Sequence, residues 1–298
     1  MSNYDDIFAN SQNEDKVEPQ AQEFNKEDWA AKKQIEREQT YNMMNEMTEK
    51  VANDAQAFKQ YLDIQSRFDR FSVGNVMLIT AQMPEATRLG DYEYWAEQGE
   101  YVKKGSEAIS ILEPGNEYTR EDGTSAISMN VKKVFDISQT GAEVRDYKTS
   151  DTRKLLKALV KSSPVPVEIG DKLMEGTNAK YSSKVKKIFV RQGMEGDEIF
   201  RALAQEIAHA DRDMNTKDNY VRAENEFGCY CTAYMICNRY GVDTKPFNFD
   251  KAPEMFDGKE NKDVRSALGD MRESMSRISE EIRKDLRNQN RNRDNSAR

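Results

Sequence analysis

The chain has 298 residues and a formal net charge of −8, with 37% hydrophobic and 33% charged residues. This length allows two domains, or one domain with extensions, and the composition is typical of a protein with a modest core and long solvated helices. The negative net charge argues against a generally basic nucleic-acid-binding protein, although a local basic surface is compatible with it.

The N-terminus, the apolar runs and the cysteines do not point to export or to a membrane. The N-terminus lacks the basic-then-apolar order of a signal peptide, and the apolar run at 76–79 is far too short to cross a bilayer. Cys229, Cys231 and Cys237 lie on one predicted helix and form no disulfide framework, so we expect them to be small core residues. We therefore expect a cytoplasmic location and no membrane partner.

The first half of the chain is predicted to be helical and then to form a small sheet. Residues 1–25 are acidic and lack apolar periodicity, which predicts a disordered leader. Ser72 is a plausible N-cap, and Pro84 ends the helix that follows it. The expected helices cover 26–50, 54–68, 73–82 and 91–99, and the hairpin strands cover 108–112 and 126–135 around a polar turn at 120–123.

The second half is predicted to combine a short sheet with longer helices. Helices are expected over 151–161, 196–213 and 220–239, the last ended by Gly241. Residues 263–291 alternate charges at helical spacing, which is typical of a solvated or partner-binding helix. The predicted strands cover 165–169, 180–181 and 187–190. The fold class we expect is α+β: N-terminal helices with a small antiparallel sheet, then a helical domain with a short sheet.

His209 is the only histidine in the chain, and it closes the helical stretch Gln205-Glu206-Ile207-Ala208-His209. In an intact HExxH zinc-peptidase helix, two imidazoles bind the metal and the glutamate acts as general base. Here the amide of Gln205, a poor zinc ligand, replaces the first imidazole. We therefore expect no zinc, no other cofactor and no catalytic residue, with Glu206 as a vestige of the base. The alternative is coincidence, with His209 merely packed or exposed.

Residues 188–244 resemble the zincin-like metallopeptidase domain attached to ArdC-like antirestriction proteins and related mobile-element proteins. When Gly241-Val242-Asp243-Thr244 is aligned with the end of the family's second helix, the third zinc ligand, a glutamate, falls at Tyr230. The resemblance then implies a vestigial metal site of Gln205, His209 and Tyr230. Glu226, one turn earlier, is a possible displaced ligand, whereas Cys229 and Cys231 are each rotated about 100° from Tyr230. The matching segments are 193–194, 205–210 and 233–244.

Residues 58–140 resemble the N-terminal single-stranded-DNA-binding domain of ArdC-like proteins, in a longer and more specific series of matches. The resemblance implies an ArdC-like domain with an N-terminal helix over 26–142, a zincin-like domain with a degenerate QExxH over 143–258, and a charged helical tail over 259–298. The matching residues are 61–63, 66–68, 71–79, 81–87, Trp95, 102–105, 109–114 and 134–140.

Several side chains of this first domain have the chemistry to contact DNA. Lysines beside a glycine and nearby arginines can bind phosphates, amides can bind base edges, and aromatic rings such as Tyr92 and Tyr94 can stack on bases. Each has a structural alternative: a tryptophan can anchor the core, amides can satisfy buried backbone groups, and lysines can be solvated turn residues. The predicted DNA contacts are Arg67, Arg70, Asn75, Gln82, Trp95, Lys103 and Lys104.

Three functions are compatible with the sequence. The leading interpretation is a non-catalytic accessory protein of a phage, plasmid or integrated element that binds single-stranded DNA; by resemblance, its role is antirestriction protection of entering DNA. The second is a metallopeptidase with an altered metal site that uses Glu206 and His209, supported by Glu226 or a cysteine. The third is an interaction module whose terminal charged helices bind a protein partner. In that tail Arg283, Lys284, Arg287, Arg291 and Arg293 could instead contact phosphates.

Overall fold

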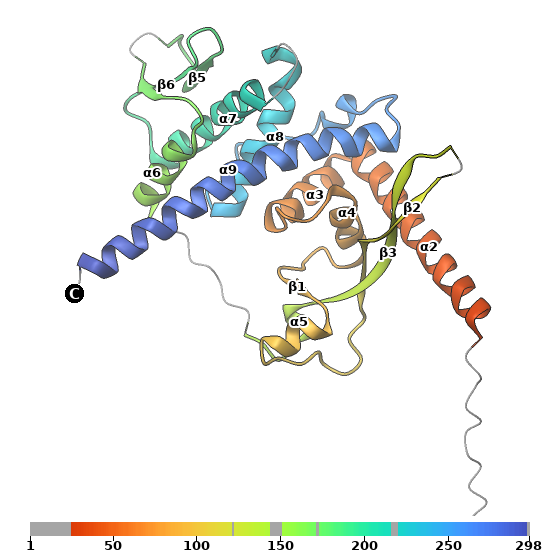
Figure 1. Ribbon diagram of the computed structural model, residues 1–298. Helices are drawn as coiled ribbons and strands as arrows, with labels where there is room; N and C mark the ends of the chain where they lie inside the picture. Colours follow the sequence, from red (N-terminus) through yellow and green to blue (C-terminus); the bar gives the residue numbers. More distant parts are fainter. Residues whose placement is uncertain (1–24, 121, 144–150, 171–172, 216–219, 297–298) are drawn as a thin grey trace, which may run out of the picture.

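The computed structural model describes residues 25–120, 122–143, 151–170, 173–215 and 220–296, with side chains as far as Gln289. The fold is α+β, with two small sheets among the helices (Figure 1). The leader predicted over 1–25 lies outside the described residues, except for Asn25. In chain order the elements are α2 (Lys26–Asn53), α3 (Ala55–Arg67), α4 (Val73–Gln82), β1 (Leu89–Gly90), α5 (Tyr92–Glu97), β2 (Ile109–Thr119), β3 (Ser125–Asp136), η1 (Ile137–Gln139), α6 (Thr152–Ser162), β4 (Val167–Ile169), β5 (Ala179–Ser182), β6 (Lys187–Val190), α7 (Gly196–Asn215), α8 (Arg222–Tyr240), η2 (Ala252–Met255) and α9 (Asn261–Ser296).

The N-terminal helices begin where short polar side chains cap them. The Asp54 carboxylate accepts a hydrogen bond from the Ala57 N–H at 2.8 Å, and the Ser72 hydroxyl accepts one from the Asn75 N–H at 3.2 Å. These bonds satisfy N–H groups that have no partner within the helix, and they confirm the N-cap predicted at Ser72. Helix α2 packs on both α3 and α4, so the three helices form one layer.

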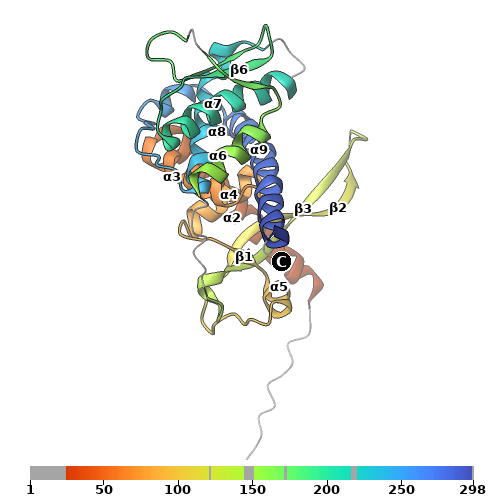
Figure 2. The same ribbon diagram turned by 90° about the vertical axis from the view of Figure 1, so that its left-hand side faces the viewer.

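The first sheet is antiparallel and has the strand order β1-β3-β2. The hairpin predicted for this region is confirmed. Strand β3 agrees with its predicted ends to within one residue, whereas β2 continues well past its predicted end, to Thr119. The ribbon that they form extends away from the helices (Figure 2). Ile109, Ile111 and Leu112 at the near end of β2 are buried against the helical layer. The near end of the hairpin is therefore part of the core and the far end is solvated.

The second sheet supports the helix pair that carries the QExxH stretch. Strand β6 lies between β4, to which it is parallel, and β5, to which it is antiparallel. Helix α7 packs on β5 and β6 with one face and on α8 with another. Helix α8 ends at Gly241, whose φ of 70° is readily adopted by glycine, as expected from the sequence.

Helix α9 runs along the molecule and contacts elements from both halves of the chain (Figure 1). It is not the fully solvated helix that its alternating charges favour. An apolar stripe recurs at helical spacing beneath those charges and is buried against α6, α7 and α8. This stripe joins one continuous hydrophobic core that includes side chains of α3, α4 and α8. The stripe consists of Val264, Leu268, Met271, Met275, Ile278 and Ile282.

A small separate cluster lies beneath α5, where Trp95 packs with Phe135 and Ile137. We call residues 84–107 together with 134–142 the α5 lobe.

Within the described ranges, no helix combines the length and apolar character needed to cross a bilayer.

Candidate functional site

Helices α7 and α8 bring Glu206 of the QExxH stretch against an arginine that sequence reasoning did not single out. The two Glu206 carboxylate oxygens accept hydrogen bonds from the Arg222 guanidinium at 2.6 and 2.8 Å, and one also accepts the Tyr181 N–H at 2.6 Å. The Glu206 side chain is only 6% exposed. A bidentate bond of this kind is among the stronger ion pairs, so the carboxylate is fully engaged.

His209 is fully buried on the same face of α7. Its Nδ1 lies 2.7 Å from the Tyr220 hydroxyl, whereas its Nε2 has no hydrogen-bond partner among the described residues and lies 3.3 Å from a Glu226 oxygen. Burial lowers the pKa of His209 from 6.5 to about 3, assisted by the positive charges of Arg222 and Lys180. The imidazole is therefore neutral at ordinary pH.

Glu226, rather than Tyr230, is the α8 residue that faces Gln205 and His209. Its carboxylate accepts a hydrogen bond from the Gln205 amide at 2.7 Å and lies 3.3 Å from the Arg222 Nε. Tyr230 instead accepts the Asn248 N–H at 2.7 Å, and its ring packs on Phe247 and Phe249. Tyr230 therefore does not face Gln205 and His209, because the 247–249 segment covers that turn of α8.

These side chains do not fit a catalytic zinc ion. The free Nε2 of His209 points toward a carboxylate as a ligand would, but the Arg222 guanidinium is already bonded to both Glu206 and Glu226. Burial raises the pKa of Cys229 to about 12, so its thiol is neutral at ordinary pH. In the part of the chain that the structure describes, no cluster of three or more His, Cys, Asp or Glu side chains is placed to hold a metal ion.

Sequence reasoning missed the partners Arg222, Tyr220 and Lys180. For Arg222 a usable signal was present: it stands four residues before Glu226, a spacing that pairs opposite charges on one helix face. Nothing in the sequence indicated that the same guanidinium would reach across to Glu206.

Four of the seven predicted DNA contacts are buried or half-buried, and they form hydrogen bonds within the fold. The Arg67 guanidinium donates to the carbonyls of Pro84 and Ala86 at 2.6 and 2.7 Å. Trp95 is 1% exposed, and its indole N–H donates to the Phe135 carbonyl at 3.1 Å, so it presents no open ring face. Asn75 and Gln82 are the other two.

Asn75 and Gln82 cover the free edge of the first sheet. Each amide accepts from and donates to the backbone of one β2 residue: Asn75 binds Leu112 through two bonds of 2.8 Å, and Gln82 binds Ser110 through bonds of 2.8 and 2.9 Å. Helix α4 thus satisfies edge N–H and C=O groups that would otherwise lack partners. This is the structural alternative considered for both amides.

We expect Asn75→Ala to lower the free energy of unfolding by about 1–3 kcal/mol, and Gln82→Ala by a similar amount, because each leaves a strand N–H and C=O unsatisfied. Urea unfolding followed by circular dichroism would measure this loss. Ser138→Ala, at an exposed position of η1, serves as the control and should change stability by less than about 0.5 kcal/mol. Unaltered stability of both amide variants would contradict the edge-covering role.

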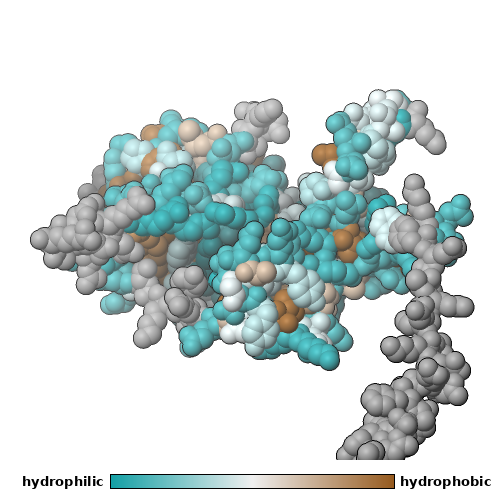
Figure 3. All heavy atoms as spheres, turned by 60° about the horizontal axis from the view of Figure 1, so that its bottom comes forward, coloured by the Kyte–Doolittle hydropathy of each residue, from teal (hydrophilic) through white to brown (hydrophobic). Residues whose placement is uncertain are grey.

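The remaining three predicted contacts, Arg70, Lys103 and Lys104, are exposed. Lys103 donates to the Ser138 carbonyl at 3.0 Å, which fixes the 98–107 loop beside η1. Two tyrosines of the same lobe are also open to solvent: Tyr92 is 64% exposed and Tyr101 is 70% exposed. Figure 3 views the molecule from the side of this lobe, where pale and brown patches lie among hydrophilic side chains.

Residues 33–158 match the family model of the N-terminal domain of the anti-restriction factor ArdC. The match begins in α2 and ends in α6, and so extends beyond the 58–140 segment in which the resemblance was expected. The class defined by this match is that of proteins carrying an ArdC-type N-terminal domain. Residues 33–158 of the chain are therefore similar to an ArdC-type N-terminal domain.

The chain is also similar to a Bacillus anthracis protein and to two crystal structures. An uncharacterized Bacillus anthracis protein, pXO2-81, is 24% identical over 272 residues, covering 72% of this chain and 46% of the relative, so the chain spans about half the length of that protein. The metal-free crystal structure of the antirestriction ArdC protein from plasmid R388 aligns with a TM-score of 0.47 at 16% identity, covering 72% of this chain and 84% of its own. The Mn(II)-bound structure gives the same score and identity, with 71% and 83% coverage.

Proposed function

We propose that this protein binds single-stranded DNA through its ArdC-type domain and acts in antirestriction protection of entering plasmid or phage DNA, and that its α7–α8 pair is a non-catalytic remnant of a zincin-like site. The observation that carries the DNA proposal is the solvent-facing set of Tyr92, Tyr101, Lys103 and Lys104 on the α5 lobe. Exposed rings stack on unpaired bases for about 1–3 kcal/mol each, and the lysines bind phosphates. Duplex bases present no free face to such rings, so single strands are preferred.

The arrangement around Glu206 supports the non-catalytic part of the proposal. A general base needs a free lone pair directed at the reacting water. Both Glu206 oxygens are bonded to Arg222, and one also accepts the Tyr181 N–H. The guanidinium supplies a fixed positive charge beside Glu206, but it has no open coordination position at which a water could be activated.

The second candidate function is a metallopeptidase with an altered site. It is favoured by one observation, the unpartnered Nε2 of buried His209 facing Glu226. Metal analysis of protein purified without chelator discriminates between the two. We expect less than stoichiometric zinc, whereas one zinc per chain that is lost in His209→Ala would support the peptidase and contradict a non-catalytic site.

We expect the double variant Tyr92→Ala/Tyr101→Ala to bind a single-stranded oligonucleotide about thirtyfold more weakly, because two stacking contacts are lost. Affinity for a duplex of the same length should change little. Fluorescence anisotropy with labelled oligonucleotides measures both.

Tyr118→Ala is the matched control, since Tyr118 is 50% exposed but lies on the hairpin outside the α5 lobe; it should bind as the wild type does. Equal wild-type affinity for single strands and duplex would refute the proposed preference. Unchanged binding by the double variant would show that the α5 lobe is not part of the DNA-binding site.

A further inference from the structure

The α5 lobe has rings for stacking but an unfavourable charge for a polyanion. Residues 84–107 contain three cations, Arg88, Lys103 and Lys104, against six carboxylates, a net charge of −3. Binding to nucleic acid depends mainly on neutralising phosphates. A chain with a net charge of −8 therefore needs a basic surface elsewhere if it binds DNA tightly.

Helix α6 and the second half of α9 lie side by side and form such a surface. The Lys161 ammonium contacts Asp285 at 2.6 Å and the Gln289 amide contacts the Lys154 carbonyl at 3.4 Å, so the two helices run antiparallel. Residues 151–163 contain four cations and one carboxylate, and residues 276–289 contain four cations and three carboxylates. The side chains of Arg291 and Arg293, predicted as phosphate contacts, lie outside the described residues.

The cations at the exposed edge of α6 are the least compensated. Arg153 and Lys157 are exposed, and neither forms an ion pair with any carboxylate of the described part of the chain. Lys161 is 64% exposed even though it contacts Asp285. These three residues recur every fourth position, which places them about 6 Å apart along one side of the helix. They form a row rather than isolated charges.

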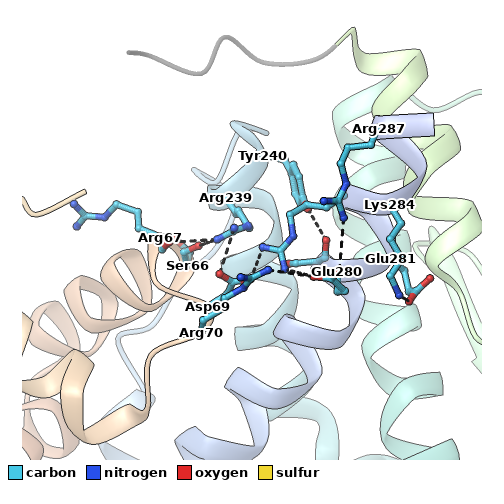
Figure 4. Close-up of polar contacts among 12 residues, drawn as sticks. Ser66, Arg67, Asp69, Arg70, Arg239, Tyr240, Glu280, Glu281, Lys284 and Arg287 are labelled. Atoms are coloured by element: carbon cyan, nitrogen blue, oxygen red, sulfur yellow. Dashed lines mark hydrogen bonds and ion pairs between the residues drawn. The ribbon is translucent and has the colours of Figure 1, made fainter. Parts of the chain in front are cut away.

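A second group of cations surrounds the loop after α3 (Figure 4). Glu280 is approached by Arg283 at 2.7 Å, by Arg287 at 3.7 Å and by Arg70 at 3.8 Å. Asp69 is shared between Arg239 and Arg283. Four guanidinium groups thus share two carboxylates, and Arg70 and Arg287 are 77% and 65% exposed.

Between the two groups lies a depression of about 620 Å³. Arg70, Lys161, Arg277 and Arg283 line it together with the hydroxyl side chains of three serines and three carboxylates. No aromatic side chain lines it within the described residues. Protein-binding surfaces typically have an apolar or aromatic centre, whereas arginine and hydroxyl groups are the usual partners of phosphate.

We propose that α6, the Arg70 loop and the second half of α9 form a surface that binds the sugar–phosphate backbone of nucleic acid without reading or stacking its bases. This inference rests on the proposed DNA-binding function and adds a second contact to it. The α5 lobe supplies the preference for single strands, and the α6–α9 surface supplies most of the salt-dependent affinity for either form.

The test variant is Arg153→Gln/Lys157→Gln. Both side chains are exposed, so we expect the variant to keep the thermal stability of the wild type. Anisotropy titrations of the full chain with a single-stranded oligonucleotide and with its duplex are repeated at several salt concentrations. We expect about tenfold weaker binding to both DNAs, and a salt dependence of log Kd for the single strand that is shallower by about 1.4, which corresponds to two lost phosphate contacts. Lys245→Gln/Lys262→Gln, two exposed lysines outside this surface, should bind like the wild type.

Each other outcome overturns the inference. If the variant keeps wild-type affinity and salt dependence while the protein still prefers single strands, the α6–α9 surface is not used but the proposed function stands. If the wild type binds no DNA, both the α6–α9 inference and the proposed DNA-binding function are refuted. If polyglutamate of equal charge competes as well as the oligonucleotide, the surface recognises acidic protein rather than a nucleic-acid backbone.

Discussion

Replacing Arg222 by alanine is expected to lower the free energy of unfolding by about 3 kcal/mol. The change leaves the Glu206 carboxylate buried with no cation beside it, and removal of one partner of a buried ion pair typically costs about 3–5 kcal/mol. The lower end applies because the Arg222 side chain is 26% exposed, so water partly screens the pair. Urea unfolding at neutral pH measures the loss.

A matched control separates this effect from the loss of any arginine. Arg272 is 23% exposed, but its partner Glu273 is 56% exposed, so Arg272→Ala should cost less than about 1 kcal/mol. Adding Glu206→Gln to Arg222→Ala should restore part of the stability, because the uncompensated charge is then gone. Equal stability of wild type and Arg222→Ala would contradict the view that this guanidinium holds the α7–α8 pair together.

The second large effect concerns pH. The pKa of His209 is about 3 in the folded protein, against an ordinary value of 6.5. Below pH 6.5 the unfolded chain therefore takes up a proton that the folded chain does not, and stability falls as the pH decreases. Between pH 8 and pH 5 the expected loss is about 2 kcal/mol, and the slope approaches about 1.4 kcal/mol per pH unit at the acid end of this range.

His209 is the only histidine in the chain, which makes this prediction specific. Other side chains with ordinary pKa values do not titrate in this range, and carboxylates whose pKa is lowered, such as Asp91 and Asp285, lose their stabilising contribution only at more acid pH. Denaturant unfolding at pH 8, 7, 6 and 5 should show the fall in the wild type and a nearly flat profile in His209→Gln. Parallel profiles for the two proteins would show that the buried imidazole is not responsible.

Local patterns in the sequence predicted much of the fold, because they reflect local physics. The N-cap at Ser72, the end of α8 at Gly241 and the β2–β3 hairpin follow from capping, glycine conformation and strand patterning. Helix α9 was misjudged for a related reason. Its many charges favour a solvated helix, but the apolar stripe from Val264 to Ile282 occurs at the same spacing and is buried.

The candidate site was less predictable, because it depends on contacts between distant segments. The amide of Gln205 in the QExxH stretch is visible in the sequence, but the contact between Arg222 and Glu206 depends on how α7 and α8 cross. The amides Asn75 and Gln82 have the chemistry of base-reading side chains, and only the packing of α4 on the β2 edge assigns them to backbone groups. Hydrogen-bonding capacity alone does not distinguish these uses.

We propose that the protein binds single-stranded DNA and that this binding needs no metal. The most direct test is an anisotropy titration of the wild-type protein with a single-stranded oligonucleotide and with its duplex, each with and without excess EDTA. We expect tighter binding to the single strand and the same Kd in the presence and absence of the chelator. Binding to neither DNA, equal binding to both, or loss of binding in EDTA would contradict the claim.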